Sequence, residues 1–376
     1  MITIVSVFPP YRGGIATFSD YLYQNLKTMA DIEAINFSHL YPGILFPGKT
    51  QFDIHKTQTE YAKRVIHSWN PFNWGESAEK ILETDPDQVL FTYWHPFFAA
   101  AYLRIVHLIK KKKPGVKISV LAHNVMPHER FPFGKNLSQK LLNTADKILL
   151  LSEKSLNEAN ALHIESEISV LFHPVYEQPF PGSSRKELRE KYGFLEEDYI
   201  PLFFGLVRPY KGLDIFINAL NSLDLKMDQI KPLIAGEFYT DKTTLLSQIE
   251  PEHKSDYTVI DRFVSDQEMA ELFFISDVLV MPYRSATQSG ILANAINFLL
   301  PSIVTDLKGL TEHIDHGKTA WIVPKEDPSE LAKAIKKLSE AEIRTDIKKR
   351  LIPLKEKLSW QNFSTRLLSE ISKENP

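Results

Sequence analysis

Two cations stand just past a short apolar segment in the second half of the chain. The segment 202–205 ends in a glycine, and Arg208 and Lys211 follow it before the next amphipathic stretch. Arginine and lysine at such a strand-to-helix turn can converge on a diphosphate and neutralise the charge on a departing one. A pair of solvated surface cations is the alternative, and spacing alone does not separate the two.

A second candidate anion site consists of small and hydroxylic residues. It follows the apolar run 278–281 and precedes an apolar helix that we expect to end near Leu300. The free backbone amides of a helix N-terminus bind anions, and neighbouring hydroxyls can add to them. Ordinary helix capping by serine or threonine is the alternative. The residues in question are Thr287, Gln288, Ser289 and Gly290.

Two turns in the first half of the chain carry further candidate groups. Gly13 and Gly14 follow the first apolar run, where glycine permits close backbone approach and the next helix directs its N–H groups at a phosphate or sugar hydroxyl. His123 ends the run 118–122 and can hydrogen-bond a substrate hydroxyl or transfer a proton. The structural alternatives are a tight turn and a histidine satisfied by local backbone.

The composition excludes several classes of chemistry. The 376 residues contain no cysteine, which removes disulfides, thiol nucleophiles and cysteine-ligated metals. Metal binding by His123, His128 and Glu129 is conceivable, but we expect no metal. Lys and Arg total 44 and Asp and Glu 47, so the net charge of -3 disfavours a basic nucleic-acid binder. Without a membrane-length apolar run or a signal-peptide pattern, a cytoplasmic protein is expected.

Short apolar runs alternate with longer amphipathic stretches along most of the chain. Each run has the length of a strand buried on both faces, and the alternation predicts parallel sheets with crossover helices. Ligands bind at the carboxyl ends of the strands in such sheets. We therefore expect the candidate groups to gather there. The runs are 2–8, 89–93, 118–122, 147–151, 202–205, 233–236, 278–281, 302–305 and 321–323.

A stretch rich in turn formers, residues 177–184, divides the chain into two domains. We place the first at 1–176 and the second at 177–360, in keeping with roughly 150 residues per domain. A cleft between the two carboxyl edges is the expected ligand site. Near the end of the second domain, Asp327 is predicted to cap a helix in a capping box with Glu330.

In their order along the chain, these motifs resemble a family 4 glycosyltransferase of the GT-B fold. The most specific stretch runs from Val259 to Asp327, and residues 204–212 resemble the family's phosphate-binding loop. The resemblance implies an α/β fold of two Rossmann-like, doubly wound parallel-sheet domains that face each other across a cleft. The first would bind the acceptor, completed by the C-terminal helix 361–376, and the second would bind the nucleotide sugar.

The resemblance also implies an activity and roles for individual residues. The activity is transfer of a sugar from a UDP- or GDP-linked donor to a glycan or lipid-linked acceptor, with retention and without a metal or other cofactor. Arg208 and Lys211 would hold the diphosphate together with the amides of 288–290. His123, in the position of the family's histidine, would contact a donor hydroxyl, and Gly13 and Gly14 match its N-terminal glycine loop. The base would be cradled by Arg262, Phe263 and Val264.

Three positions depart from the family's pattern. Ala286 and Asn294 stand where it has two glutamates, and Leu206 stands where it has an arginine. Asn294 can still hydrogen-bond a ribose hydroxyl, but without a charge. These departures keep two alternatives open, a nucleotide-sugar-binding partner protein without transfer activity and an epimerase or hydrolase on the same fold.

A run of four lysines, Lys110–Lys113, offers a contact with the membrane surface. Such a run can attract anionic lipid headgroups and bring the first domain to a lipid-linked acceptor. A solvated helix end is the alternative, and the more common one.

Overall fold

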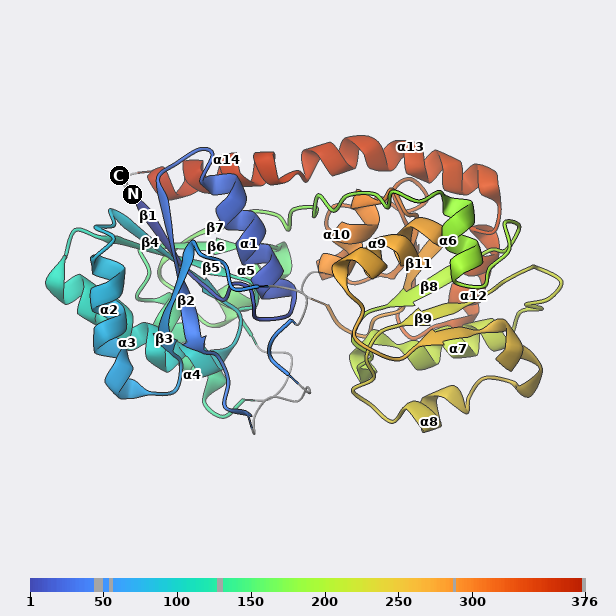
Figure 1. The fold of residues 1–376 in the computed structure, drawn as a ribbon, viewed down its shortest axis with the longest axis horizontal. Helices are drawn as coiled ribbons and strands as arrows, with labels where there is room; N and C mark the ends of the chain where they lie inside the picture. The colour runs from blue at the N-terminus through green and yellow to red at the C-terminus, as the bar shows by residue number, and fades with distance from the viewer. Residues whose placement is uncertain (44–49, 54–56, 127–130, 287–288, 374–376) are drawn as a thin grey trace. The chain divides into compact units, whose positions relative to one another are not determined.

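The computed structural model describes residues 1–43, 50–53, 57–126, 131–286 and 289–373. The chain forms two compact units (Figure 1). The first comprises Met1–Phe172 together with Trp360–Pro376, and the second comprises His173–Ser359. The division therefore lies a few residues before the predicted boundary at 176. The C-terminal segment packs with the first unit, since helices α1 and α14 contact each other.

A seven-stranded parallel sheet forms the centre of the first unit, in the order β3-β2-β1-β4-β5-β6-β7. All six residues of β4 are buried, so both faces of the sheet are covered there. This explains why the apolar runs show little alternation. The strands are β1 (Ile2–Val5), β2 (Ile32–His39), β3 (Ala62–His67), β4 (Gln88–Tyr93), β5 (Lys117–Ala122), β6 (Lys147–Leu150) and β7 (Glu167–Val170).

The helices of the first unit cover this sheet with one apolar side each. In α1, Phe18, Leu22 and Leu26 recur every fourth residue and are fully buried. The helices are α1 (Gly14–Leu26), α2 (Trp74–Leu82), α3 (Ala99–Lys112), α4 (Gly134–Leu142), α5 (Glu153–Ala161) and α14 (Trp360–Ser372), with short 3-10 turns η2 (Pro71–Asn73) and η3 (Pro96–Phe98).

The second unit has a six-stranded parallel sheet in the order β10-β9-β8-β11-β12-β13. Its strands are β8 (Pro201–Phe204), β9 (Leu233–Ala235), β10 (Thr258–Ile260), β11 (Val278–Met281), β12 (Ser302–Thr305) and β13 (Trp321–Val323). Its helices are α6 (Arg185–Lys191), α7 (Leu213–Asn221), α8 (Lys242–Leu246), α9 (Asp266–Ile275), α10 (Gly290–Asn297), α11 (Lys308–Thr311), α12 (Pro328–Lys337) and α13 (Ala341–Lys357), with 3-10 turns η4 (Pro209–Lys211) and η5 (Pro251–Asp256).

The start of α12 tests the capping prediction in detail. The Asp327 side chain accepts a hydrogen bond from the backbone N–H of Glu330 at 3.0 Å, as predicted. The Glu330 carboxylate, however, accepts from Lys333 at 2.7 Å. The cap is therefore confirmed, but the capping box is only half formed because a lysine one turn away binds its glutamate.

Each sheet has one point where the direction of strand succession reverses. In the first unit it lies between β1 and β4, and in the second between β8 and β11. Ligands of open α/β sheets bind outside the carboxyl ends of the strands at this point. The glycine pair follows β1, the Arg208–Lys211 loop follows β8, and the loop before α10 follows β11. The predicted site segments therefore flank the two switch points.

Candidate functional site

The loop after β8 places a lysine ammonium directly against the backbone of a glycine. Gly205 has φ of 100°, a left-handed value that side chains disfavour. A Cβ built on it would lie 2.6 Å from Lys211 Nζ and 2.7 Å from Ile291 Cδ1. Since Ile291 belongs to α10, this glycine brings the loop after β8 and the helix after β11 together around one ammonium group.

Lys211 is buried, with only 5% of its surface exposed. Its Nζ lies 5.6 Å from the centre of the Tyr283 ring. It forms no hydrogen bond or ion pair with the part of the chain that the structure describes. Burial, reinforced by the positive charge of Arg208, lowers its pKa to about 7. A buried amine in this state is poised to take up a proton when an anion arrives.

Arg208 shares the loop with Lys211 and lines a cavity. Its guanidinium is 5.3 Å from the centre of the Tyr239 ring. The cavity, about 290 Å³, is lined by Arg208 and also by Asp214 and Arg284. Arg208 and Lys211 thus belong to one loop, as predicted, and Lys211 is not the solvated surface cation of the alternative interpretation.

A salt bridge that the sequence analysis did not find fixes this loop. Arg284, just after β11, is paired with Asp214 of α7 at 2.5 Å and donates to the Pro209 carbonyl at 2.8 Å. Gly212 strengthens the same connection, because a Cβ there would lie 2.1 Å from the Pro282 carbonyl oxygen. The sequence does place an arginine, Arg284, at the carboxyl end of a predicted strand, which could have marked it as a site residue. Its partner Asp214 could not be identified without the fold.

The N-terminus of α10 begins at Gly290, and Ser289 is its N-cap. The Ser289 hydroxyl accepts from the Leu292 N–H at 3.4 Å, so capping is at least one of its roles. A Cβ on Gly290 would lie 3.3 Å from the Tyr176 ring. Thr287 and Gln288 lie outside the described residues, so their anion-binding role remains a prediction.

Asn294 lies one turn into α10 and is 9% exposed. Its Oδ1 is buried and has no hydrogen-bond partner among the described residues. Its Nδ2 lies 3.5 Å from the sulfur of Met269, a weak acceptor. Because this side-chain oxygen accepts no hydrogen bond from the described residues, it is suited to accept one from a ligand hydroxyl. Binding a ribose hydroxyl is the role expected for this position.

The loop expected to cradle a base follows β10. Arg262 forms a two-pronged salt bridge with Glu268 of α9, with both N–O distances 2.6 Å. This salt bridge raises the pKa of Arg262 and ties the loop to the start of α9. Phe263 is 37% exposed and Val264 half-buried, so the aromatic ring is the loop's accessible apolar surface.

In the first unit, His123 follows β5 and is 2% exposed. Its ring meets Phe18 of α1 edge-on at 4.5 Å, and its backbone N–H donates to the Tyr93 carbonyl at 2.7 Å. Gly13 precedes α1 with φ of 112°. A Cβ on Gly13 or Gly14 would meet no atom within 4 Å, so the glycine turn is open on that side.

The lysine run of α3 is largely paired. Lys110 binds Asp146 at 2.8 Å, while Lys112 binds Glu79 and Lys113 binds Asp85, both at 2.6 Å. Exposed pairs of this kind are weak, but they reduce the net positive charge that would attract a lipid surface. The predicted membrane contact through Lys110–Lys113 therefore loses much of its electrostatic basis. No helix in the described ranges is long and apolar enough to span a membrane.

No metal-binding cluster of three or more His, Asp or Glu side chains occurs among the residues that the structure describes. His128 and Glu129, which the sequence analysis considered with His123, lie outside them.

The chain has two Rossmann-like units, and each has a parallel sheet with site loops at its switch point. This is the GT-B class of fold. A solved structure shares this fold over nearly the whole chain. Anabaena Alr3699/HepE in complex with UDP has a TM-score of 0.76, 14% sequence identity and 99% coverage of both chains. The same protein has also been solved with UDP-glucose.

A family model matches most of the second unit. Residues 184–353 match the model of the family described as "Glycosyl transferases group 1". Alpha-D-kanosaminyltransferase of Streptomyces kanamyceticus is 23% identical over 59% of each chain. D-inositol 3-phosphate glycosyltransferase of Streptomyces bingchenggensis (strain BCW-1) is 24% identical over 54% of this chain and 47% of its own. The match thus spans about half to three fifths of these two relatives.

Proposed function

We propose that the protein transfers a sugar from a nucleotide-sugar donor to a glycan or lipid-linked acceptor. The observation that carries the proposal is the buried ammonium of Lys211 at the β8/β11 switch point, where a diphosphate would lie. Cleavage of the bond at the anomeric carbon leaves negative charge on the nucleoside diphosphate. A cation held in a dry site stabilises that charge strongly.

In this proposal, the other groups bind the remaining parts of the donor. Arg208 and the amides at the start of α10 hold the diphosphate, Phe263 with its loop holds the base, and Asn294 accepts from a ribose hydroxyl. His123 of the first unit contacts a hydroxyl of the donor sugar, beside the glycine turn at Gly13 and Gly14. Transfer proceeds with retention, and the protein's own cations replace a metal ion.

The donor we propose first is UDP-linked. The Anabaena protein with the same fold was solved with UDP and with UDP-glucose. GDP-linked sugars are the second choice, because the groups that we assign to the diphosphate do not distinguish the two bases. We propose the first unit as the acceptor side.

The test is release of nucleoside diphosphate from a panel of UDP- and GDP-sugars with glycan and lipid-linked acceptors. Loss of a single preorganised charge-stabilising group typically lowers the rate about 10²- to 10³-fold, and we expect Lys211→Ala to fall in this range. Lys226→Ala removes an exposed lysine of the same unit and serves as the matched control. Full activity of the Lys211 variant would contradict the assignment.

A nucleotide-sugar-binding protein without transfer activity is the second candidate. Ala286 and Asn294, in place of two glutamates, are the observation that favours it. Calorimetric binding of UDP without turnover on any acceptor would support it. An epimerase or hydrolase would instead consume donor with no acceptor present.

A further inference from the structure

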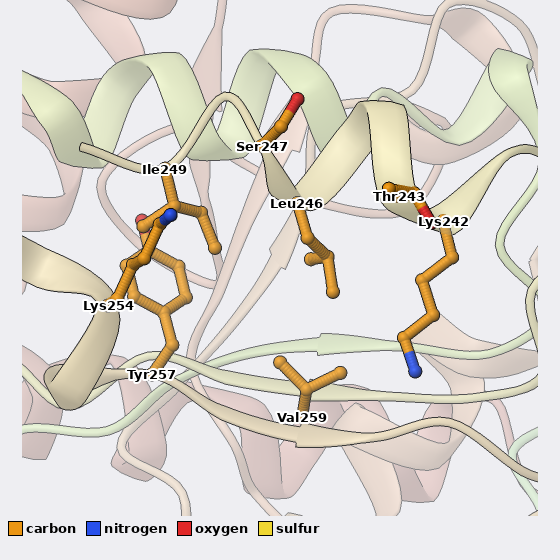
Figure 2. A pocket seen from close by; sticks show the side chains of 8 residues that line it. All are labelled: Lys242, Thr243, Leu246, Ser247, Ile249, Lys254, Tyr257 and Val259. Carbon is orange, nitrogen blue, oxygen red and sulfur yellow. The ribbon is translucent and has the colours of Figure 1, made fainter. Parts of the chain in front are cut away.

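A pocket of about 460 Å³ lies in the second unit between α8, η5 and the strand β10 (Figure 2). It arises because α8 is the crossover helix between β9 and β10 but has only five residues, none of them buried. Such a short helix leaves the edge strand incompletely covered. The volume is in the range of small-molecule sites, roughly 300–1,000 Å³.

The middle of the pocket is apolar. Leu246 of α8, Ile249 and Val259 of β10 supply its wall and floor, and Figure 2 shows Leu246 and Val259 between the two lysines. β10 is the outermost strand of its sheet, so no strand among the described residues covers its outer edge. This surface suits an apolar body.

One end of the pocket holds a hydrogen-bond donor with nothing to bind. The Tyr257 hydroxyl is buried and has no hydrogen-bond partner in the described part of the chain. Burial, with Asp256 beside it, raises the pKa of Tyr257, so the phenol keeps its proton at neutral pH. A buried donor without an acceptor is costly, and a ligand oxygen would remove that cost.

The same end also holds a cation. Lys254 is exposed, and its ammonium has no ion-pair partner within the described ranges. At the far end of the pocket, Lys242 is already paired with Asp261 at 2.9 Å. Asp256 is paired with Lys231 at 2.6 Å, so its charge is balanced as well. The uncompensated charge at this pocket is therefore positive and belongs to Lys254.

We propose that this pocket binds a small soluble amphipathic anion, with a carboxylate or phosphate at Tyr257 and Lys254 and an apolar body across Leu246, Ile249 and Val259. The hydroxyl donates to the anion and the ammonium balances its charge. The pocket is a separate site from the one assigned to the donor, since none of its lining residues is among those assigned to the diphosphate, the base or the ribose. The proposal therefore stands whether or not the transfer activity does.

The experiment is a calorimetric titration of the full chain with laurate below its micelle concentration, and with dodecyltrimethylammonium as a cation of equal chain length. We expect laurate alone to bind. Tyr257→Phe keeps the ring and removes only the donor, so it should weaken laurate binding about tenfold. Lys254→Glu should weaken it at least as much, and Leu246→Trp, which fills the pocket, should remove it.

Lys186→Glu reverses the charge of an exposed lysine elsewhere in the second unit and should leave laurate binding unchanged. Circular dichroism of each variant should match that of the wild type, which checks that the variant is folded. Equal binding of the two amphiphiles, or laurate binding that survives Leu246→Trp, would overturn the proposal. So would Lys254-dependent co-sedimentation with phosphatidylglycerol vesicles in the absence of laurate binding, which would assign the cation to a bilayer instead.

Discussion

Replacing Lys211 with methionine should make the unliganded protein more stable and remove its affinity for a nucleoside diphosphate. Methionine retains most of the apolar stem and removes the ammonium. The pKa of Lys211 falls from 10.5 to about 7 on folding. At about 1.4 kcal/mol for each pH unit, this corresponds to a penalty of about 5 kcal/mol for the fully charged group. The penalty is the free energy that a bound diphosphate would offset.

The sign of the pH dependence follows from the direction of the shift. Below about pH 7 the lysine is charged in both states, and the wild type carries the full penalty. Between pH 7 and 10.5 the unfolded chain holds more protons than the native one, so wild-type stability rises with pH relative to the variant. The free energy of unfolding of the variant should therefore exceed that of the wild type by about 4 kcal/mol at pH 7 and by about 2 kcal/mol at pH 9.

The assay is urea unfolding at both pH values, with hydrogen exchange of the β8 and β11 amides identifying the transition of the second unit. Lys226→Met, at an exposed position, should change the free energy of unfolding by no more than about 0.5 kcal/mol. Calorimetry of the wild type with UDP at pH 8 should show uptake of about one proton, as anion binding recharges the amine. A Met variant less stable at pH 7, or a difference that does not shrink at pH 9, would refute the reasoning.

Two further variants, each with a control, test packing in the second unit, one at the site and one at the opposite end of the sheet. Gly205→Ala should lower UDP affinity about 10- to 100-fold because its Cβ would displace the Lys211 ammonium. Gly193 also has a positive φ but has open space around it, so Gly193→Ala should retain UDP affinity and serves as the control. Asp277→Asn should lower the free energy of unfolding by about 3–5 kcal/mol, since it leaves the buried guanidinium of Arg189, 2.8 Å away, without its countercharge. Asp346→Asn, at an exposed pair with Arg350, should cost less than about 1 kcal/mol, and equal losses in both urea titrations would contradict the argument.

The parallel sheets were predictable because they depend on local pattern. A strand buried on both faces must be continuously apolar, so runs such as 278–281 and 302–305 coincide with β11 and β12. The GT-B fold expected from the motifs is confirmed by solved structures that cover nearly the whole chain. The alternation of strand and helix also placed the loops, because in a parallel sheet every loop that follows a strand lies at the same edge, the carboxyl one.

Ion pairs were not predictable, because they depend on which elements become neighbours. The Lys110–Lys113 run reads as a block of free charge, yet Asp146, its partner at position 110, lies 36 residues away. Arg284 and Asp214, 70 residues apart, fix the site loop in the same way. Residue type thus indicates which groups can do chemistry, whereas packing decides which of them keep their charge for a ligand.

The burial of Lys211 is the clearest example of what only the fold supplies. Its sequence neighbours, Tyr210 and Gly212, are equally compatible with an exposed lysine. The burial arises because Gly205 has no side chain and Ile291 closes the other side, and these two positions meet only once β8 and β11 pair. A cation so placed destabilises the empty protein, which natural chains tolerate mainly where binding compensates for it. This energetic cost is the strongest physical reason to assign an anionic ligand to the carboxyl ends of β8 and β11.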